Sequence, residues 1–407
     1  KGHQKYFPTR THNGELTNRF ITVSNIESID ESQVIAGNQR VIRARLSDAK
    51  FFYDTDRKHT LRSRRDRLDK ITFHPKLGSL GAKTERLKKL SEQIARSIGV
   101  DVKIMHQAAE LSRCDLVSEM VLEFDELQGR IGTLYATLEQ ENPDVAQAIQ
   151  GLYQPRGASD SIPDDLFGSI LALADRLDTL AGLFAIDQPP TGSKDPFALR
   201  RAAIGVLRLN ERTELNLNLG TWLSEAFNAQ PIKGAPDALA ALVQFISDRE
   251  RVRLLELGYR HDIVMAVQAT NKLNTAATEA RVKALTEKVN SEDFGILMSV
   301  NKRVSHLLKH DDSDCCAVNT SLFEHSCENA LFQRAGRVNE DVKRAVSRET
   351  YTEALECLLS MKPETDAFFE HVMVNSENTE IKKNRLGICR LVKDAYEQLA
   401  DFSFIQQ

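Results

Sequence analysis

Apolar residues recur every three or four positions through most of the chain, which is the spacing of one face of an α-helix. The pattern begins near Ser32 and is clearest in three stretches, at residues 104–120, 166–183 and 386–399. We expect an amphipathic helix in each of these stretches. A periodicity of this extent predicts a mainly α-helical protein.

The first 27 residues differ from the rest of the chain. Two apolar stretches, at residues 6–8 and 20–23, flank Asn13 and Gly14, and this arrangement predicts a β-hairpin. An isolated hairpin is only marginally stable, so we expect it to be the end of a larger α/β domain. The first residues hold neither an initiator methionine nor an apolar signal core. We therefore expect a fragment without a secretion signal.

The strongest break in the helical pattern is the loop at residues 188–196, which is rich in proline and glycine. Asp195 and Pro196 at its end predict the N-cap and first position of a helix over 197–209. We predict four parts of the chain: the end of an α/β domain at 1–58, a helical domain at 59–210, a helical connecting region at 211–289 and a helical bundle at 290–407.

Charge limits how the chain can meet a partner. It has 54 lysines and arginines against 58 aspartates and glutamates, a net charge of -4. This balance excludes a bulk polycation, so nucleic acid would have to be bound by local patches. The segment 57–90 is strongly basic and the segment 101–150 strongly acidic. The simplest interpretation is that the two segments attract each other within one helical domain.

The sequence lacks the patterns of a membrane span, of a disulfide-bonded protein and of several common catalytic and phosphate-binding sites. No stretch approaches the ~18 apolar residues of a membrane span, and the six cysteines form no disulfide framework. The sequence also holds no phosphate-binding loop, no Gly-x-Ser-x-Gly elbow and no His-Glu-x-x-His helix. We expect a cytoplasmic protein that does not contact membranes.

The helical region 60–209 resembles the HD superfamily of metal-dependent phosphohydrolases in outline. In that superfamily a His, a His-Asp pair and a later Asp converge on metal ions. The corresponding residues here are His74, Cys114, Asp115 and Asp175. Cysteine is a soft ligand in a site meant for hard ions, so we expect a fold kept without its metal. An active metal-dependent phosphohydrolase is the alternative.

A second group of possible metal ligands lies at residues 310–327. It contains His310, Asp311, Asp312, Asp314, Cys315, Cys316, His325 and Cys327. Adjacent cysteines are poor tetrahedral chelators, so we expect a surface loop there and no metal.

Basic side chains recur on the predicted helices and are the candidate contacts to RNA phosphates. The set is Lys194, Arg200, Arg201, Arg208, Lys302, Arg303, Lys309, Lys382, Lys383, Arg385 and Arg390. Asn301 is expected to open the helix that carries Lys302, Arg303 and Lys309. Residues 381–393 hold no acid, so we expect that stretch to present its charges outward. Ordinary solvated surface is the alternative for any single residue.

Motifs along the whole chain resemble the C-terminal portion of the beta subunit of bacterial glycyl-tRNA synthetase. The segments are residues 2–8 (GHQKYFP), 23–28 (VSNIES), 114–116 (CDL), 174–180 (ADRLDTL), 190–203 (PTGSKDPFALRRAA), 301–304 (NKRV), 368–369 (FF) and 372–374 (VMV). The Cys and His content of 311–327 departs from the family.

The resemblance implies a tRNA-binding chain that supports ATP-dependent glycylation of tRNA(Gly). The implied complex is a heterotetramer of two alpha and two beta chains, in which the alpha chain carries the catalytic core with ATP and Mg²⁺. This chain would hold an HD-like domain and a C-terminal anticodon-binding domain, no cofactor and no catalytic residue. A helical scaffold that does not bind RNA remains a further alternative.

Overall fold

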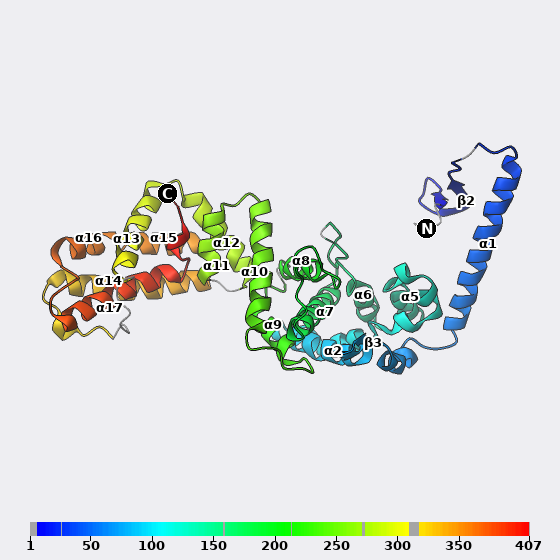
Figure 1. The fold of residues 1–407 in the computed structure, drawn as a ribbon, viewed down its shortest axis with the longest axis horizontal. Helices are drawn as coiled ribbons and strands as arrows, with labels where there is room; N and C mark the ends of the chain where they lie inside the picture. Colours follow the sequence, from blue (N-terminus) through cyan, green and yellow to red (C-terminus); the bar gives the residue numbers. More distant parts are fainter. Residues whose placement is uncertain are drawn as a thin grey trace. The chain divides into compact units, whose positions relative to one another are not determined.

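The computed structural model describes residues 6–25, 27–157, 159–212, 214–270, 273–308 and 317–406. Helices make up most of these residues, which confirms the prediction of a mainly α protein (Figure 1). Contacts along the chain divide it into two units, at residues 1–59 and 60–407. Each unit is described by itself. The finer division of 60–407 into three parts stays a prediction.

The first unit contains the predicted hairpin. Strands β1 (Tyr6–Arg10) and β2 (Leu16–Thr22) pair antiparallel, with Tyr6 opposite Thr22. Gly14 in the turn has a φ of 83°, a conformation that glycine adopts readily. Helix α1 (Glu31–Asp56) follows, and the Asp30 side chain accepts the N–H groups of Ser32 and Gln33 at its start.

The second unit begins with short elements that lead into a helical layer. They are η1 (Arg62–Lys70), β3 (Thr72–His74), β4 (Gly78–Ser79), α2 (Leu80–Ser97), α3 (Val102–Leu111), η2 (Cys114–Val117), α4 (Glu119–Glu123), η3 (Asp125–Leu127), α5 (Arg130–Leu138) and α6 (Pro143–Gly151). Helix α7 (Leu166–Ala185) is at the centre of this layer and contacts α2, α3, α6, α8, α9 and α10. Its predicted apolar stripe is confirmed.

The single helix predicted over 104–120 is wrong. Helix α3 ends at Leu111, and residues 114–117 form a 3₁₀ turn before α4 begins at Glu119. The break has local causes. Ser118 caps α4 by accepting the Val121 N–H, and the turn brings the Asp115 carboxylate to the Gly129 and Gly132 N–H groups. A continuous helix would forgo these hydrogen bonds.

Four further helices follow the proline-rich loop: α8 (Leu199–Asn210), α9 (Leu219–Asn228), α10 (Ala238–Glu256) and α11 (His261–Thr270). The predicted start of α8 is wrong by two residues, because its N-cap is Ala198, which has a φ of 54°. Asp195 still caps the helix from upstream. Its two carboxylate oxygens accept the N–H groups of Leu199 and Arg200 at 2.7 and 2.9 Å.

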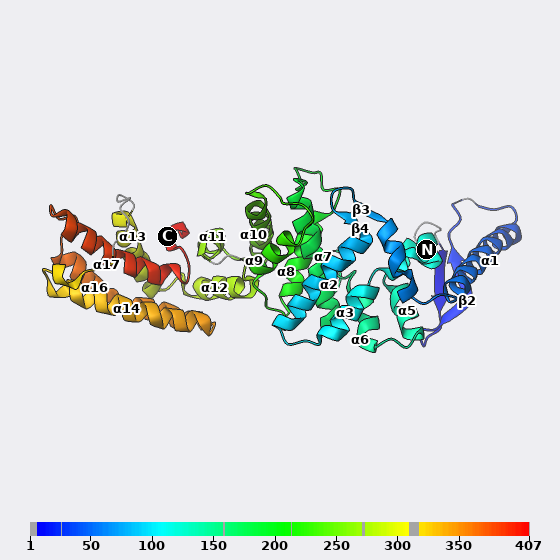
Figure 2. The same ribbon diagram turned by 90° about the horizontal axis from the view of Figure 1, so that it is seen from below.

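The C-terminal part is a helical bundle of α12 (Thr275–Lys288), α13 (Glu292–Leu308), α14 (Ser326–Ser347), α15 (Tyr351–Leu359), α16 (Lys362–His371) and α17 (Thr379–Glu397), with η4 (Thr320–Leu322) and η5 (Phe402–Phe404). Figure 2 shows α14 and α17 side by side, in agreement with their contacts. The stripe on α17 is buried as predicted, from Leu386 to Leu399. Asn301 lies within α13 and does not open it, because that helix already begins at Glu292.

No helix among the residues described is long and apolar enough to cross a membrane.

Candidate functional site

A groove between α13 and α16 brings together basic and aromatic side chains. It has a volume of about 1000 Å³ and is lined by Ser299, Lys302, Arg303, His306, Leu307, Asp366, Phe369 and Glu370. The α13 sequence explains which residues face it. Val300 and Val304 are buried in the bundle core, so positions 302, 303 and 306 lie on the outer side of the helix.

Arg303 is the best-defined cation of this groove. Its guanidinium lies over the Phe369 ring, 6.0 Å from the centroid. One of its nitrogens is 3.8 Å from Asp366, which also pairs with Lys362 at 2.6 Å. The Arg303 side chain is 60% exposed, so it remains available to an incoming anion or ring. Lys302 beside it is exposed, and Lys309 lies outside the residues described.

Phe369 and His306 were not selected from the sequence as site residues. The adjacent pair Phe368 and Phe369 gave a signal, because neighbouring residues on a helix point about 100° apart and a one-sided helix buries only one of them fully. Phe368 is fully buried and Phe369 only partly. That contrast could be anticipated from helical periodicity, but the pairing of α16 with α13 could not.

The basic stretch of α17 is not a uniform surface. Lys383 is exposed and Lys382 half-buried. Arg390 forms ion pairs within its own helix, at 2.8 Å to Asp394 and 3.3 Å to Glu397. Arg385 was expected to face outward with these residues, and that placement is wrong: its side chain is only 4% exposed.

Arg385 connects α17 to the start of α14. Its Nε donates to Glu328 at 2.8 Å, one terminal nitrogen donates to Glu324 at 2.7 Å, and the other donates to the Met373 carbonyl at 3.0 Å. Glu328 is fully buried and also accepts the N–H groups of Glu324 and His325. Burial favours a raised pKa for Glu328, but these hydrogen bonds outweigh it and hold the pKa below its usual value. Arg385 is therefore a structural group, and we withdraw it as an RNA contact.

The basic group near the proline-rich loop is partly occupied within the chain. Lys194 is exposed in the loop. Arg200 donates to the Gly192 carbonyl at 2.6 Å, and Arg208 donates to the Gly157 carbonyl at 3.2 Å. Arg201 lies exposed on α8. Arg200 is bonded to the proline-rich loop, whereas Arg201 lines a pocket beside α7 and α8.

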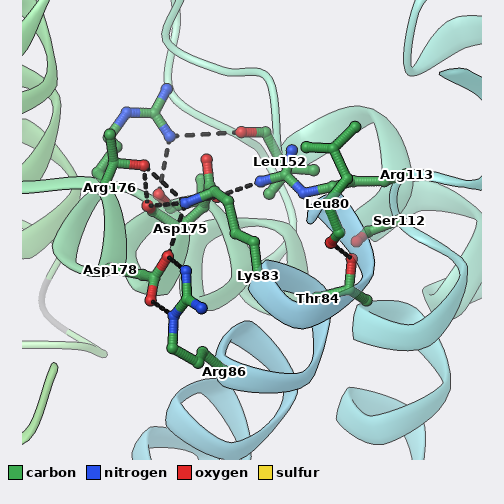
Figure 3. Close-up of polar contacts among 12 residues, drawn as sticks. Leu80, Lys83, Thr84, Arg86, Ser112, Arg113, Leu152, Asp175, Arg176 and Asp178 are labelled. Atoms are coloured by element: carbon green, nitrogen blue, oxygen red, sulfur yellow. Dashed lines mark hydrogen bonds and ion pairs between the residues drawn. The ribbon is translucent and has the colours of Figure 1, made fainter. Parts of the chain in front are cut away.

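Asp175, one of the predicted HD positions, lies where carboxylates meet cations (Figure 3). Lys83 on α2 is 3.1 Å from Asp175 and 2.8 Å from Asp178, both on α7. Arg113 also pairs with Asp175, and Arg86 with Asp178 at 2.7 Å. Burial favours a raised pKa for Asp175, but the charges of Arg113, Lys83 and Arg176 outweigh it and keep the pKa well below its usual range.

The other HD positions are no better suited to a metal ion. Asp115 is fully buried, and one of its oxygens accepts the Gly129 and Gly132 N–H groups at 2.6 and 3.2 Å. Burial raises the pKa of the Cys114 thiol to about 12, so the thiolate that binds metals is disfavoured. The His74 ring packs edge-on against Phe197. Asp175 is already occupied by Lys83 and Arg113, so the donor set does not fit a metal.

Among the described residues, no three or more His, Cys, Asp or Glu side chains are placed to hold a metal ion. The second group of possible metal ligands, at residues 310–327, is described only in part. Its members 310–316 lie outside the residues described, and only His325 and Cys327 are within them.

Comparison with known proteins adds the following. A family model of the glycyl-tRNA synthetase beta subunit matches residues 1–269, and a model of the DALR anticodon binding domain matches residues 297–401. Glycine–tRNA ligase beta subunits from Chromohalobacter salexigens, Methylobacillus flagellatus and Neisseria meningitidis serogroup B are 42%, 41% and 40% identical to the chain. The matches cover 99–100% of this chain but only 58–59% of the relatives.

Proposed function

The chain belongs to the glycyl-tRNA synthetase beta-subunit family, and on that premise we propose that it is the tRNA-binding portion of a glycine–tRNA ligase beta subunit. Its partners are tRNA(Gly), an alpha subunit and a second beta subunit in a heterotetramer. It supports ATP-dependent glycylation carried out by the alpha subunit, where ATP and Mg²⁺ bind. It acts in the cytoplasm.

One observation carries this proposal: the α13–α16 groove sets a partly exposed phenylalanine beside cations, within the region that the anticodon-binding model matches. Unpaired bases of an RNA loop are held by stacking on aromatic rings and arginine planes, and basic groups hold the backbone. The Arg303 guanidinium and the Phe369 ring offer both functions at one place. The groove suits a single-stranded loop such as an anticodon.

The remaining basic residues act mainly as phosphate contacts, which position RNA without reading its sequence. With Arg385 removed, the set is Lys194, Arg200, Arg201, Arg208, Lys302, Arg303, Lys309, Lys382, Lys383 and Arg390. We assign no catalytic residue, cofactor or metal to this chain. Residues 59–210 are proposed to be an HD-like domain in which Asp115 and Asp175 serve as structural hydrogen-bond and ion-pair partners.

Two variants separate the roles within the groove. Lys302→Gln should weaken tRNA binding and reduce the slope of log K against log salt by about 0.7 to 0.9, the contribution of one phosphate contact. Phe369→Leu should weaken binding while leaving that slope unchanged, because a stacking ring releases no counterions. Filter binding of transcribed tRNA(Gly) across a salt series measures both.

Arg344→Gln is the matched control, since Arg344 is exposed on α14 and outside the groove. If both groove variants bind tRNA(Gly) with the affinity and salt slope of this control, the groove does not contact RNA. A separate assay tests the division of labour. Highly purified chain should show no glycine-dependent ATP–pyrophosphate exchange, and exchange by the chain alone would contradict it.

A further inference from the structure

A second pocket lies between α7, α8 and the loop after α6, away from the α13–α16 groove. Its volume is about 380 Å³, within the usual range of small-ligand sites. Among the residues that line it are Arg156, Arg176, Arg201, Tyr153 and Thr179. Three of the eleven described residues that line it are arginines, against one carboxylate, that of Asp175.

Arg176 is a largely buried cation whose hydrogen bonds go only to backbone carbonyls. It donates to Ala172 at 2.8 Å, to Pro155 at 2.9 Å and to Leu152 at 3.3 Å. It forms no ion pair with any carboxylate of the described residues. The nearby charge of Asp175 is already shared by Lys83 and Arg113. A buried guanidinium without a full counter-charge favours an incoming anion.

Three further polar groups of the pocket, on Arg201, Arg156 and Tyr153, have hydrogen-bond donors that no described residue uses, whereas Thr179 and Asp175 are already paired. Arg201 forms no hydrogen bond or ion pair with any residue in the described part of the chain. Arg156 donates from its side chain only to the Gln128 carbonyl, at 3.4 Å. The Tyr153 hydroxyl is buried and has no hydrogen-bond partner. A hydroxyl left without a hydrogen bond in a buried position costs stability. An anion that accepts a hydrogen bond from this hydroxyl removes that cost.

We propose that this pocket binds the phosphate group of a nucleotide. Arginine side chains donate to phosphate oxygens in pairs, which distinguishes them from a point charge. Arg176 supplies the positive field at the inner wall, Arg201 and Arg156 supply free donors, and Tyr153 supplies a neutral donor. This site goes beyond tRNA binding in the α13–α16 groove. The phosphate belongs either to a free mononucleotide or to the end of an RNA chain.

Isothermal titration of the chain with adenosine 5′-monophosphate, adenosine and inorganic phosphate tests the site. The monophosphate should bind and adenosine should not. Arg201→Gln should weaken binding about tenfold and Tyr153→Phe several-fold, as expected for the loss of one charged and one neutral donor. Arg201 is exposed and Tyr153→Phe is conservative, so both variants are expected to fold.

Arg96→Gln is the matched control, because Arg96 is exposed on α2 and does not line the pocket. A 5′-phosphorylated trinucleotide that binds in an Arg201-dependent manner, when the mononucleotide does not, assigns the phosphate to RNA. If neither ligand binds, or if Arg96→Gln weakens binding as much as Arg201→Gln, the proposal is wrong. The salt series of tRNA(Gly) binding with Lys302→Gln and Phe369→Leu is read independently of this titration, so a failure here is distinguishable from a failure of the groove.

Discussion

Replacing Arg385 with methionine should destabilise the C-terminal bundle, because the guanidinium is buried among its partners. Methionine keeps most of the apolar stem but removes the guanidinium that pairs with Glu328 and Glu324. Glu328 is fully buried, so its charge would lose its cationic partner in a region that water does not reach. Removing one member of a buried pair costs about 3–5 kcal/mol.

Hydrogen exchange followed by mass spectrometry measures this loss locally, since the chain has more than one domain and no single unfolding transition is assured. A cost of about 3–5 kcal/mol corresponds to amide exchange in α14 and α17 that is roughly 150- to 4,000-fold faster. Peptides from α7 should exchange as in the unmodified chain. The control is Arg390→Gln, five residues along the same helix. Its ion pairs are exposed, so we expect a cost of about 0.5 kcal/mol or less.

The pH dependence supplies a second readout. Burial opposes ionisation of Glu328, but the hydrogen bonds from Arg385 and the backbone hold its pKa below the ordinary value. A depressed folded-state pKa adds stability that is fully present above the unfolded pKa of about 4.3 and is lost as pH falls through the folded pKa. The deficit of Arg385→Met should therefore shrink in acid. Exchange in α14 and α17 no faster than in Arg390→Gln at pH 7 would refute the reasoning.

Three polar side chains of the second unit, Glu250, Lys83 and Asp195, offer further tests. Burial raises the pKa of Glu250 to about 7 despite a hydrogen bond from Gln268. The folded state therefore holds a proton that the unfolded state releases, so stability should fall as pH rises from about 4 to about 7. A Glu250→Gln variant, followed by thermal unfolding across this pH range, should lose that dependence on pH. Lys83→Met should speed amide exchange in α2 and α7 by roughly 10- to 150-fold, because it removes one of the two cations paired with the buried Asp178 and Arg86 keeps the other pair, so the cost is that of a hydrogen bond to a charged group, about 1.5–3 kcal/mol. Asp195→Ala should cost about 0.5–2 kcal/mol, seen as faster exchange in the first turn of α8.

Helices and their buried faces were predictable because the evidence for them is local. The apolar stripes of α17 and α7 follow from spacing within twenty residues, and both are confirmed. The burial of α7 on nearly all sides was not predicted, because it depends on the helices that surround it. The interruption after Leu111 was not predictable in the same way. It depends on Asp115 reaching the N–H groups of Gly129 and Gly132, which lie 14 and 17 residues further along.

Whether a charged side chain is exposed or ion-paired was harder to predict, because its partner is distant in sequence. Arg385 lies in an acid-free stretch, yet its carboxylates come from residues 57 and 61 positions earlier. Asp175 resembles a metal ligand by its motif, yet Arg113, 62 positions away, pairs with it in the fold. A window of sequence reports how many charges are present. It does not report which of these charges already form ion pairs with residues distant in sequence.

The pairing of each arginine within the protein decides which of them has charge left for a phosphate. Arg385 has two carboxylates and a carbonyl around it and offers nothing to a ligand. Arg303 has one distant carboxylate, which it shares with Lys362, so part of its charge faces the groove. Arg176 has carbonyls alone, and Arg201 has no partner among the residues described. The free energy available for binding an anion rises in that order, because less of each cation's interaction is already satisfied within the protein. Arginines of equal formal charge in one sequence therefore divide into a structural group, a proposed RNA contact and a proposed phosphate site.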